Sequence, residues 1–336
     1  MGLYTNKKIL ITGATGTIGQ RLVRRLLQDD PAVIRVFSRD EHKQFKMQQA
    51  LHEYNRSLRF LIGDVRDVNR LMRAMENIDY VFHLAAMKHV PACEYNPFEA
   101  VKTNVIGTQN VIQAAIASGV KKVLFTSSDK AIAPTNTYGA TKLTGERLIT
   151  AAELQKGSKD TVFHSVRFGN VMGSRGSVIP LFKAQILNRK AVTVTDPEMK
   201  RFMMTPSQAV SLMLKANEMA MGGEVFVLKM PVVRLADLVD VVVEETTRKY
   251  RISEKIEIKI IGIRPGEKRY EEIMTEDEER NALETEDMYI LPSVYADARR
   301  TYPGVLKKRS PVFSLANQEP ISKELLRKWI CEERLI

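Results

Sequence analysis

The sequence Lys8-Ile9-Leu10-Ile11-Thr12-Gly13-Ala14-Thr15-Gly16-Thr17-Ile18-Gly19 lies near the start of the chain and decides the fold. Its first five residues are mostly apolar, which predicts a short buried strand. After the glycines, Leu22, Leu26 and Leu27 recur at helical spacing. Glycines at a strand-to-helix turn let the backbone approach a pyrophosphate, whose charge is favoured at a helix N-terminus. We therefore expect a dinucleotide-binding turn formed by Gly13, Thr15, Gly16, Thr17, Ile18 and Gly19.

The end of the second expected strand, residues 33–37, indicates which dinucleotide is bound. A carboxylate at this position would bind ribose hydroxyls and repel a 2′-phosphate. Ser38 takes that place, with Arg39 next to it and Lys43 one helical turn further on. A hydroxyl and a guanidinium suit a phosphate, so these residues predict NADP rather than NAD. The alternative is a solvated cluster of charges, and Asp40 lies within it.

Further cofactor contacts are expected at the ends of the third strand, residues 58–62, and the fourth, residues 81–84. An aspartate at the first of these ends can accept a hydrogen bond from an adenine amino group, and small residues at the second admit the cofactor. An asparagine in the following helix can bond backbone groups of the sheet. The residues concerned are Asp64, Val65, Ala85, Ala86 and Asn104. His83 lies inside an apolar strand and is expected to be a core histidine.

Strands and helices alternate five times in the first half of the chain, which is typical of an α/β protein. We predict a Rossmann-type, doubly wound parallel sheet with a smaller C-terminal substrate lobe. The cofactor domain is expected at residues 1–170, with 206–248 returning to it. The lobe is expected at 171–205 and 249–336. Within the lobe, an acidic stretch at 271–287 reads as helical, and a helix at 321–333 closes the chain.

Composition excludes several classes of protein. The chain has 336 residues and a net charge of +11, but its basic residues are scattered among acidic ones, so we expect no nucleic-acid partner. No apolar run reaches the length of a membrane span and no signal peptide is recognisable, which predicts a cytoplasmic protein without a membrane partner. Cys93 and Cys331 lack metal-ligand spacing, and no metal is expected.

Candidate catalytic residues follow the fifth expected strand, Val123-Leu124-Phe125. Tyr138 and Lys142 are four residues apart in a helical segment and therefore lie on one face. A lysine ammonium beside a tyrosine hydroxyl favours the phenolate and lowers its pKa. Such a tyrosine can take a proton from an alcohol while hydride leaves the same carbon.

Taken together, these motifs resemble the extended short-chain dehydrogenase/reductase superfamily. Within it, the chain is most similar to the soluble UDP-N-acetylglucosamine 4,6-dehydratases, which supply rare sugars for bacterial surface glycans and flagellin. The resemblance covers nearly the whole chain. The diagnostic motifs are Ser38-Arg39-Asp40-Glu41, Ala85-Ala86-Met87-Lys88-His89-Val90-Pro91, Ser128-Asp129-Lys130-Ala131, Arg167-Phe168-Gly169-Asn170-Val171 and Arg264-Pro265-Gly266-Glu267-Lys268.

The resemblance implies roles for these residues. Elimination of water needs one group to take the C5 proton and another to protonate the departing oxygen. Lys130 and Asp129 would do so, while Tyr138 and Lys142 would oxidise C4 and also contact the cofactor. Lys88 would contact both cofactor and substrate. The full substrate set would be Lys88, Ser128, Lys130, Asn170, Arg201, Arg264 and Glu267. Members of this family commonly self-associate, so a homo-oligomer is expected.

Two alternatives remain open at this point. A sugar 4-epimerase could share the fold, although epimerases of this superfamily usually carry small hydroxyl residues in place of Asp129-Lys130. A cofactor-sensing regulatory protein could also share it, although the intact Tyr138/Lys142 pair speaks against this reading. Tyr138 also separates the chain from the large membrane-bound relatives, which typically have methionine there. Inversion at C5 is expected, but retention and a GDP-linked sugar remain possible.

Overall fold

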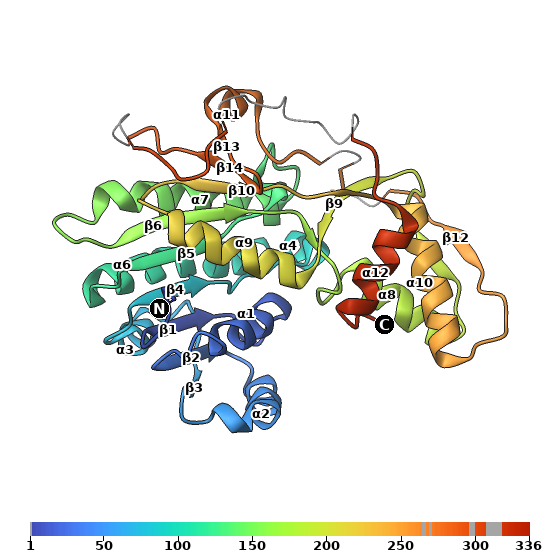
Figure 1. Cartoon of the computed structure of the whole chain (residues 1–336), viewed down its shortest axis with the longest axis horizontal. Coiled ribbons are helices and arrows are strands. Elements are labelled where there is room, and N and C mark those ends of the chain that lie inside the picture. Colours follow the sequence, from blue (N-terminus) through green and yellow to red (C-terminus); the bar gives the residue numbers. More distant parts are fainter. Residues whose placement is uncertain (1, 264–266, 269–270, 296–299, 307–317) are drawn as a thin grey trace.

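A nine-stranded sheet organises the computed structural model, which describes residues 2–263, 267–268, 271–295, 300–306 and 318–336 (Figure 1). The strand order is β13-β14-β10-β6-β5-β4-β1-β2-β3. Neighbouring strands from β3 to β10 are parallel, whereas β14 and β13 are added antiparallel at one edge. The strands are β1 (Lys8–Thr12), β2 (Val33–Ser38), β3 (Leu58–Ile62), β4 (Tyr80–His83), β5 (Lys122–Thr126), β6 (Val162–Arg167), β10 (Val225–Leu228), β13 (Leu283–Glu284) and β14 (Met288–Leu291).

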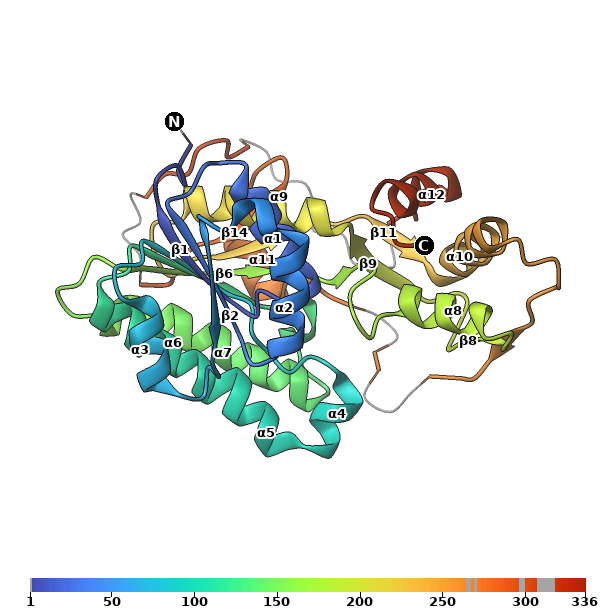
Figure 2. The ribbon, with the colours of Figure 1, turned by 90° about the horizontal axis from the view of Figure 1, so that it is seen from below.

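Helices cover both faces of this sheet (Figure 2). One face carries α1 (Thr17–Leu27) and α9 (Pro206–Met219), which pack against each other. The other carries α3 (Val68–Met75), α6 (Gly107–Ser118) and α7 (Thr137–Gln155). Shorter elements near β2–β4 and ahead of α6 are α2 (Glu41–Ala50), η1 (His52–Tyr54), α4 (Val90–Tyr95), α5 (Pro97–Val101) and η2 (Lys102–Ile106), the last a π-helical turn.

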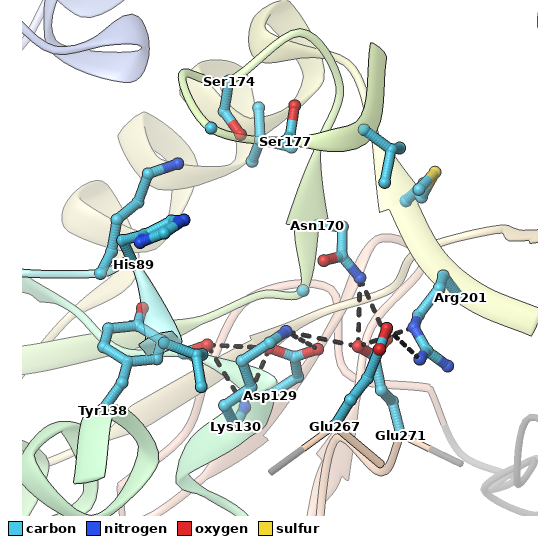
Figure 3. Close-up of a pocket in the computed structure, with 18 of the residues that line it drawn as sticks. His89, Asp129, Lys130, Tyr138, Asn170, Ser174, Ser177, Arg201, Glu267 and Glu271 are labelled. Carbon is cyan, nitrogen blue, oxygen red and sulfur yellow. Dashed lines mark hydrogen bonds and ion pairs between the residues drawn. The ribbon is translucent and has the colours of Figure 1, made fainter. Parts of the chain in front are cut away.

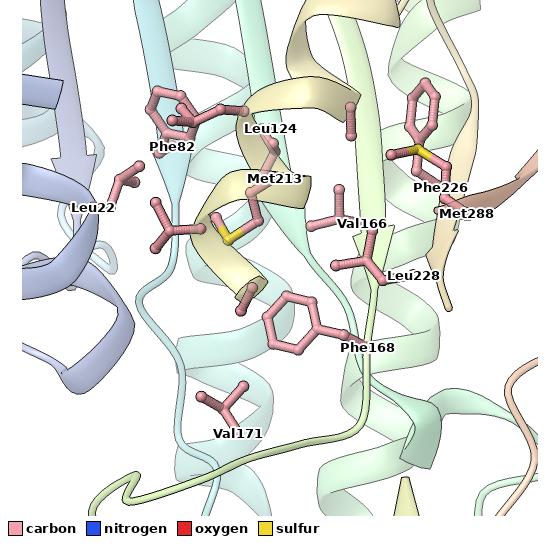
Figure 4. Packing of buried hydrophobic residues seen from close by; sticks show 14 of the residues in the cluster. Leu22, Phe82, Leu124, Val166, Phe168, Val171, Met213, Phe226, Leu228 and Met288 are labelled. Atoms are coloured by element: carbon pink, nitrogen blue, oxygen red, sulfur yellow. The ribbon is translucent and has the colours of Figure 1, made fainter. Parts of the chain in front are cut away.

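Two hydrophobic cores form because successive strand residues point to opposite faces. In β5, Leu124 packs towards α1 and α9, whereas Val123 and Phe125 pack towards α3, α6 and α7. The α9 side is filled by Met213 together with residues from β4, β6, β10 and β14, including Phe226 (Figure 4). Strands buried on both faces explain the continuous apolar runs in the sequence. The predicted α/β fold class is confirmed.

The lobe has a third core of its own. It combines α8 (Val178–Leu187), α10 (Leu235–Tyr250) and α12 (Lys323–Glu332) with strands of two small sheets. One sheet pairs β8 (Val192–Val194) with β12 (Ile258–Ile260), and the other has the order β11 (Val232–Arg234), β9 (Lys200–Met204), β7 (Asn170–Val171). At the end of the chain Glu333 forms an ion pair with Arg21 of α1, so the last turn of the lobe contacts the first helix.

The packing differs in two places from the division expected from sequence. Helix α10, which was expected to return to the sheet, packs against α8 and α12. Strands β13 and β14, which were expected in the lobe, extend the main sheet. We therefore propose that α10 is grouped with the lobe and residues 283–291 with the sheet. The helix expected over 271–287 is wrong in extent, because α11 covers only Glu276–Asn281. The closing helix is confirmed as α12.

Stability should depend on the core beneath α9. Phe226 is fully buried, so Phe226→Ala leaves a cavity and should lower the free energy of unfolding by about 3–5 kcal/mol. Phe45 on α2 is 56% exposed, and Phe45→Ala should change that free energy by no more than about 0.5 kcal/mol. Urea denaturation of both variants and the parent measures the difference. Equal losses from the two substitutions would contradict this assignment of the core.

Candidate active site

A cavity of about 430 Å³ lies where the carboxyl ends of β4, β5 and β6 face the lobe. The end of a parallel sheet is where ligands bind in doubly wound folds. The cavity brings together, from segments far apart in sequence, nine of the residues that the sequence indicates for chemistry and substrate binding. These are Lys88, Ser128, Asp129, Lys130, Tyr138, Lys142, Asn170, Arg201 and Glu267. Arg264 lies outside the described residues.

The glycine turn lies beside this cavity and brings β1 close to the end of β4. Gly13 has a φ of +70°, and a Cβ added there would lie 2.8 Å from the backbone nitrogen of Ala85. Gly19 is equally restricted, because its Cβ would lie 2.6 Å from Ala14. Gly16, Thr15 and Thr17 complete the turn, and Ile18 lines the cavity, as does Ala86 from the loop after β4. Gly13 and Gly19 therefore permit the close packing of this turn, and Gly16 between them is exposed, which is where a pyrophosphate could approach the backbone.

The residues indicated for the adenosine end of the cofactor gather at the carboxyl ends of β2 and β3. Arg39 forms an ion pair of 3.6 Å with Asp64, and the hydroxyl of buried Ser38 accepts a hydrogen bond from Gln44 at 3.1 Å. Although burial opposes it, bonds from Arg66 and the charge of Arg39 hold the pKa of Asp64 below its ordinary value. Lys43 bonds the carboxylate of Asp40. Val65 is buried beneath this cluster.

Asn104 positions the loop after β4 and does not line the cavity. It lies in the π-helical turn η2, where its amide accepts from the backbone of Met87 at 2.8 Å and donates back to it at 2.9 Å. It also donates to Thr141 of α7 at 3.0 Å. His83 behaves as the predicted core histidine: it bonds Thr12 at 2.7 Å, and burial lowers its pKa to about 3.

A tight approach between two segments builds the catalytic end of the cavity. After β5 the chain forms the short helix η3 (Asp129–Ala131), and α7 begins six residues later. Asn136 caps α7 by accepting a hydrogen bond from the Gly139 backbone at 2.9 Å. A Cβ on Gly139 would lie 2.1 Å from the Lys130 carbonyl oxygen, so only glycine permits this packing. The approach places Tyr138 beside η3.

A continuous chain of polar contacts crosses the cavity floor (Figure 3). Tyr138 is hydrogen-bonded to Ser128, whose hydroxyl donates to Asp129 at 2.8 Å. The Lys130 ammonium lies 3.2 Å from both carboxylate oxygens of Asp129 and 3.3 Å from Glu271. Burial opposes the charge of Lys130, but the two carboxylates and Tyr138 raise its pKa above the ordinary value. Lys130 is therefore an ammonium in the ligand-free protein.

Tyr138 and Lys142 lie on one face of α7, as predicted, but they interact differently from the expectation. Burial raises the pKa of Tyr138, and the opposing influences are its bond with Ser128 and the charge of Lys130, rather than that of Lys142. The Lys142 ammonium instead lies 4.1 Å from the ring centre of Phe125. Burial lowers the pKa of Lys142 to about 7, and Glu146 offsets this only in part.

Glu271 is the site residue that the sequence analysis missed. Its carboxylate accepts from Asn170 at 3.0 Å and lies 3.4 Å from Nε of Arg201. Arg201 also lies 3.4 Å from Glu267. The available signal was the spacing of Glu271, four residues after Glu267. The helix expected over residues 271–287 conceals this signal, because it assigns Glu271 to an acidic helix and not to the site.

Two buried hydroxyls fit a polar ligand in the cavity. Within the part of the chain that the structure describes, Ser127 and Ser177 have no hydrogen-bond partner, and both line the cavity. Buried polar groups are normally bonded, so a ligand with polar groups would satisfy them. Among the described residues, no group of acidic, histidine or cysteine side chains has the arrangement of a metal site, and no helix has the length and apolarity to cross a membrane.

Comparisons with known proteins agree with this geometry. A family model described as polysaccharide biosynthesis protein matches residues 9–293. A UDP-N-acetylglucosamine 4,6-dehydratase (inverting) of Campylobacter jejuni is 43% identical over 87% of this chain and 85% of its own length. A UDP-glucose 4-epimerase of Rickettsia rickettsii is 42% identical over 86% and 84%. The X-ray structure of Pen from Bacillus thuringiensis is 56% identical, with a TM-score of 0.90 over 98% of this chain and 99% of that one.

The burial of Lys142 should make stability depend on pH. Its pKa falls to about 7 in the folded protein and is ordinary in the unfolded chain, so above pH 7 the unfolded state binds more protons. The free energy of unfolding should therefore rise by up to about 1.4 kcal/mol per pH unit between about pH 7 and about pH 10, relative to Lys142→Met. Urea denaturation across this range measures it. Parallel curves for parent and variant would show that Lys142 keeps an ordinary pKa.

Proposed function

The chain belongs to the polysaccharide biosynthesis protein family, and on this premise we propose that it is a nucleotide-sugar 4,6-dehydratase acting on UDP-N-acetylglucosamine. The observation that carries the proposal is the ion pair between buried Asp129 and partly buried Lys130, which is connected to Tyr138 through the hydroxyl of Ser128. With a dinucleotide as hydride acceptor, oxidation of a sugar alcohol needs only the tyrosine as a base, whereas elimination of water needs a further acid and base. The 43% identity to a protein named for this activity supports the same conclusion.

We propose NADP as the resident cofactor. Gly16 in the glycine turn is exposed, so a pyrophosphate could approach the backbone there, and Ser38 and Arg39 at the end of β2 suit a 2′-phosphate. When bound, this group supplies a hydride acceptor that later returns the hydride to the sugar. Lys88, Lys142 and the Ala85-Ala86 segment border the same end of the sheet and would hold its nicotinamide half, while Asn104 would act only by holding the loop after β4 in place.

The chain's own residues would then act in two stages. Tyr138 removes the C4 hydroxyl proton, and the positive charge of Lys130 favours the phenolate that this requires. The C4 ketone acidifies the C5 proton. Lys130 would pass its own proton to the Asp129 carboxylate, 3.2 Å away, and could then take the C5 proton. Asp129 would give the proton it has received to the oxygen that leaves C6 as water, and Lys130 would afterwards return a proton to C5. The product is a 4-keto-6-deoxy sugar, and no external reductant is consumed.

Substrate contacts are proposed for the lobe side of the cavity. Arg201 and Arg264 would hold the diphosphate, and Glu267 would accept from ribose hydroxyls. Asn170, Lys88 and Ser128 also line the cavity and are proposed to contact the sugar. Inversion at C5 is proposed because the Campylobacter relative is named as inverting. Self-association is also proposed, supported by Tyr95 and Phe98, which are 88% and 62% exposed near α5.

A 4-epimerase is the second candidate, because relatives at 42% identity carry that name. An epimerase needs no group to eliminate water, so the ion pair of Asp129 and Lys130 would then have no catalytic role. NMR of the product formed from UDP-N-acetylglucosamine separates the two candidates. A 4-keto-6-deoxy sugar supports the dehydratase, the galacto epimer supports the epimerase, and no turnover would support a cofactor-sensing regulator.

The cofactor proposal predicts a preference that one substitution removes. The parent should bind NADP⁺ more tightly than NAD⁺, and Arg39→Ala should lose most of that preference because the 2′-phosphate loses its guanidinium. Isothermal titration of both cofactors against both proteins measures this. Equal affinities in the parent would overturn the assignment of NADP.

The dehydratase proposal predicts that the two stages can be separated. Asp129→Asn cannot donate a proton as an acid, so product formation should slow by about two to four orders of magnitude. Oxidation at C4 should persist, and reduced cofactor should accumulate in its absorption band. Tyr138→Phe should give neither reduced cofactor nor product. Turnover of Asp129→Asn at the parent rate would favour the epimerase.

A further inference from the structure

Glu271 joins three side chains that the proposed function places around the substrate. Its carboxylate lies 3.3 Å from the Lys130 ammonium, 3.0 Å from the Asn170 amide and 3.4 Å from Nε of Arg201. The side chain is only 8% exposed, so these contacts are poorly screened by water. Figure 3 shows it between Lys130 and Arg201 on the cavity floor.

Arg167 anchors the segment that carries Glu271. The carbonyl of Ile273 accepts a hydrogen bond from Arg167 at 3.0 Å, and Ile273 itself is buried in the core beneath α9. Arg167 also bonds Glu278 of α11 at 2.8 Å. Glu271 therefore lies two residues before a backbone position that is hydrogen-bonded and buried.

Charged and titratable groups surround Lys130 from every element packed against it. Asp129 lies on η3, Glu271 on the segment before α11, Tyr138 on α7 and Lys88 on the loop after β4. Of the two carboxylates, Asp129 is next to Lys130 in sequence, whereas Glu271 is 141 residues away. Glu271 thus stabilises the ammonium form of Lys130 in addition to Asp129.

We propose that Glu271 is a positioning residue for elimination, which holds the Lys130 ammonium beside Asp129 and determines the pH at which Lys130 becomes a base. This inference rests on the proposed function for its role in the reaction, but not for its effect on Lys130. A carboxylate within ion-pair distance favours the charged form of a lysine. Neutralising the Glu271 carboxylate therefore lets Lys130 lose its proton at lower pH.

The first test needs no turnover. Trace acetylation with acetic anhydride across the neutral and alkaline range, quantified by peptide mass spectrometry, gives the titration midpoint of Lys130. In Glu271→Gln the midpoint should fall by about one to two pH units. Glu276→Gln makes the same change of charge at an exposed position and should leave the midpoint unchanged. An unchanged midpoint in Glu271→Gln would overturn the proposal.

A second variant covers the case in which glutamine prevents folding, which circular dichroism would reveal. Glu271→Asp keeps the charge but shortens the side chain, so the midpoint of Lys130 should fall by a smaller amount. A folded Glu271→Asp protein with the parent midpoint, together with an unfolded Glu271→Gln protein, would assign Glu271 a structural role only and overturn the proposal.

The third test addresses the reaction. In Glu271→Gln the limb of the pH profile for product formation that rises with pH should move to lower pH by a similar amount, while hydride removal from C4 keeps its profile. A lower KM with an unmoved profile would show that the carboxylate merely occupies the place of the sugar, which overturns the proposal. A parent that forms no dehydrated product would refute the proposed function, and the acetylation result would still decide the role of Glu271.

Discussion

The buried guanidinium of Arg167 is the interaction on which the geometry of the site depends. It lies at the end of β6, fully buried, and is bonded to Glu146 of α7 and Glu278 of α11. It thus joins the sheet, the helix that carries Tyr138 and the segment that carries Glu271. Removing one partner of a buried ion pair leaves an uncompensated charge, which typically costs about 3–5 kcal/mol. A charge in this position is therefore tolerated only while all three elements are in place.

The cavity floor connects the two stages of the proposed chemistry through one hydroxyl. Ser128 is hydrogen-bonded to both Tyr138 and Asp129. A change of charge at Tyr138 or at Asp129 therefore alters the electrostatic environment of the other. The cations and carboxylates alternate along this line, from Asp129 through Lys130 to Glu271 and Arg201. Such alternation lets several ionised groups share a cavity from which water is partly excluded.

Local pattern was enough to predict most of the sheet and much of the site. The turn at Gly13 and the helical spacing of Tyr138 and Lys142 depend on neighbours in sequence, and both occur in the structure. Glu271 could not be found in the same way, because its contact with Lys130 spans 141 residues. The sequence also does not reveal that the pKa of Lys130 lies above that of Lys142. Lys142 is buried over the ring of Phe125, whereas Lys130 is stabilised as an ammonium by a carboxylate from a distant segment. The grouping of α10 could not be derived from sequence either, because an apolar face does not reveal which core it covers; its place with the lobe is our proposal from the packing.

The contribution of the chain's last residues to the lobe affects how the protein can be synthesised. Leu326, Ile330 and Ile336 fill the core formed with α8 and α10, and Glu333 contacts α1. The strands from β1 to β6 are complete by residue 167, and can pair while the ribosome is still translating the second half. The lobe core can form only after residues 326–336 have been made. A message truncated before the codons for these residues would therefore yield a chain with a formed sheet and an open lobe, which exposes apolar surface to chaperones and proteases.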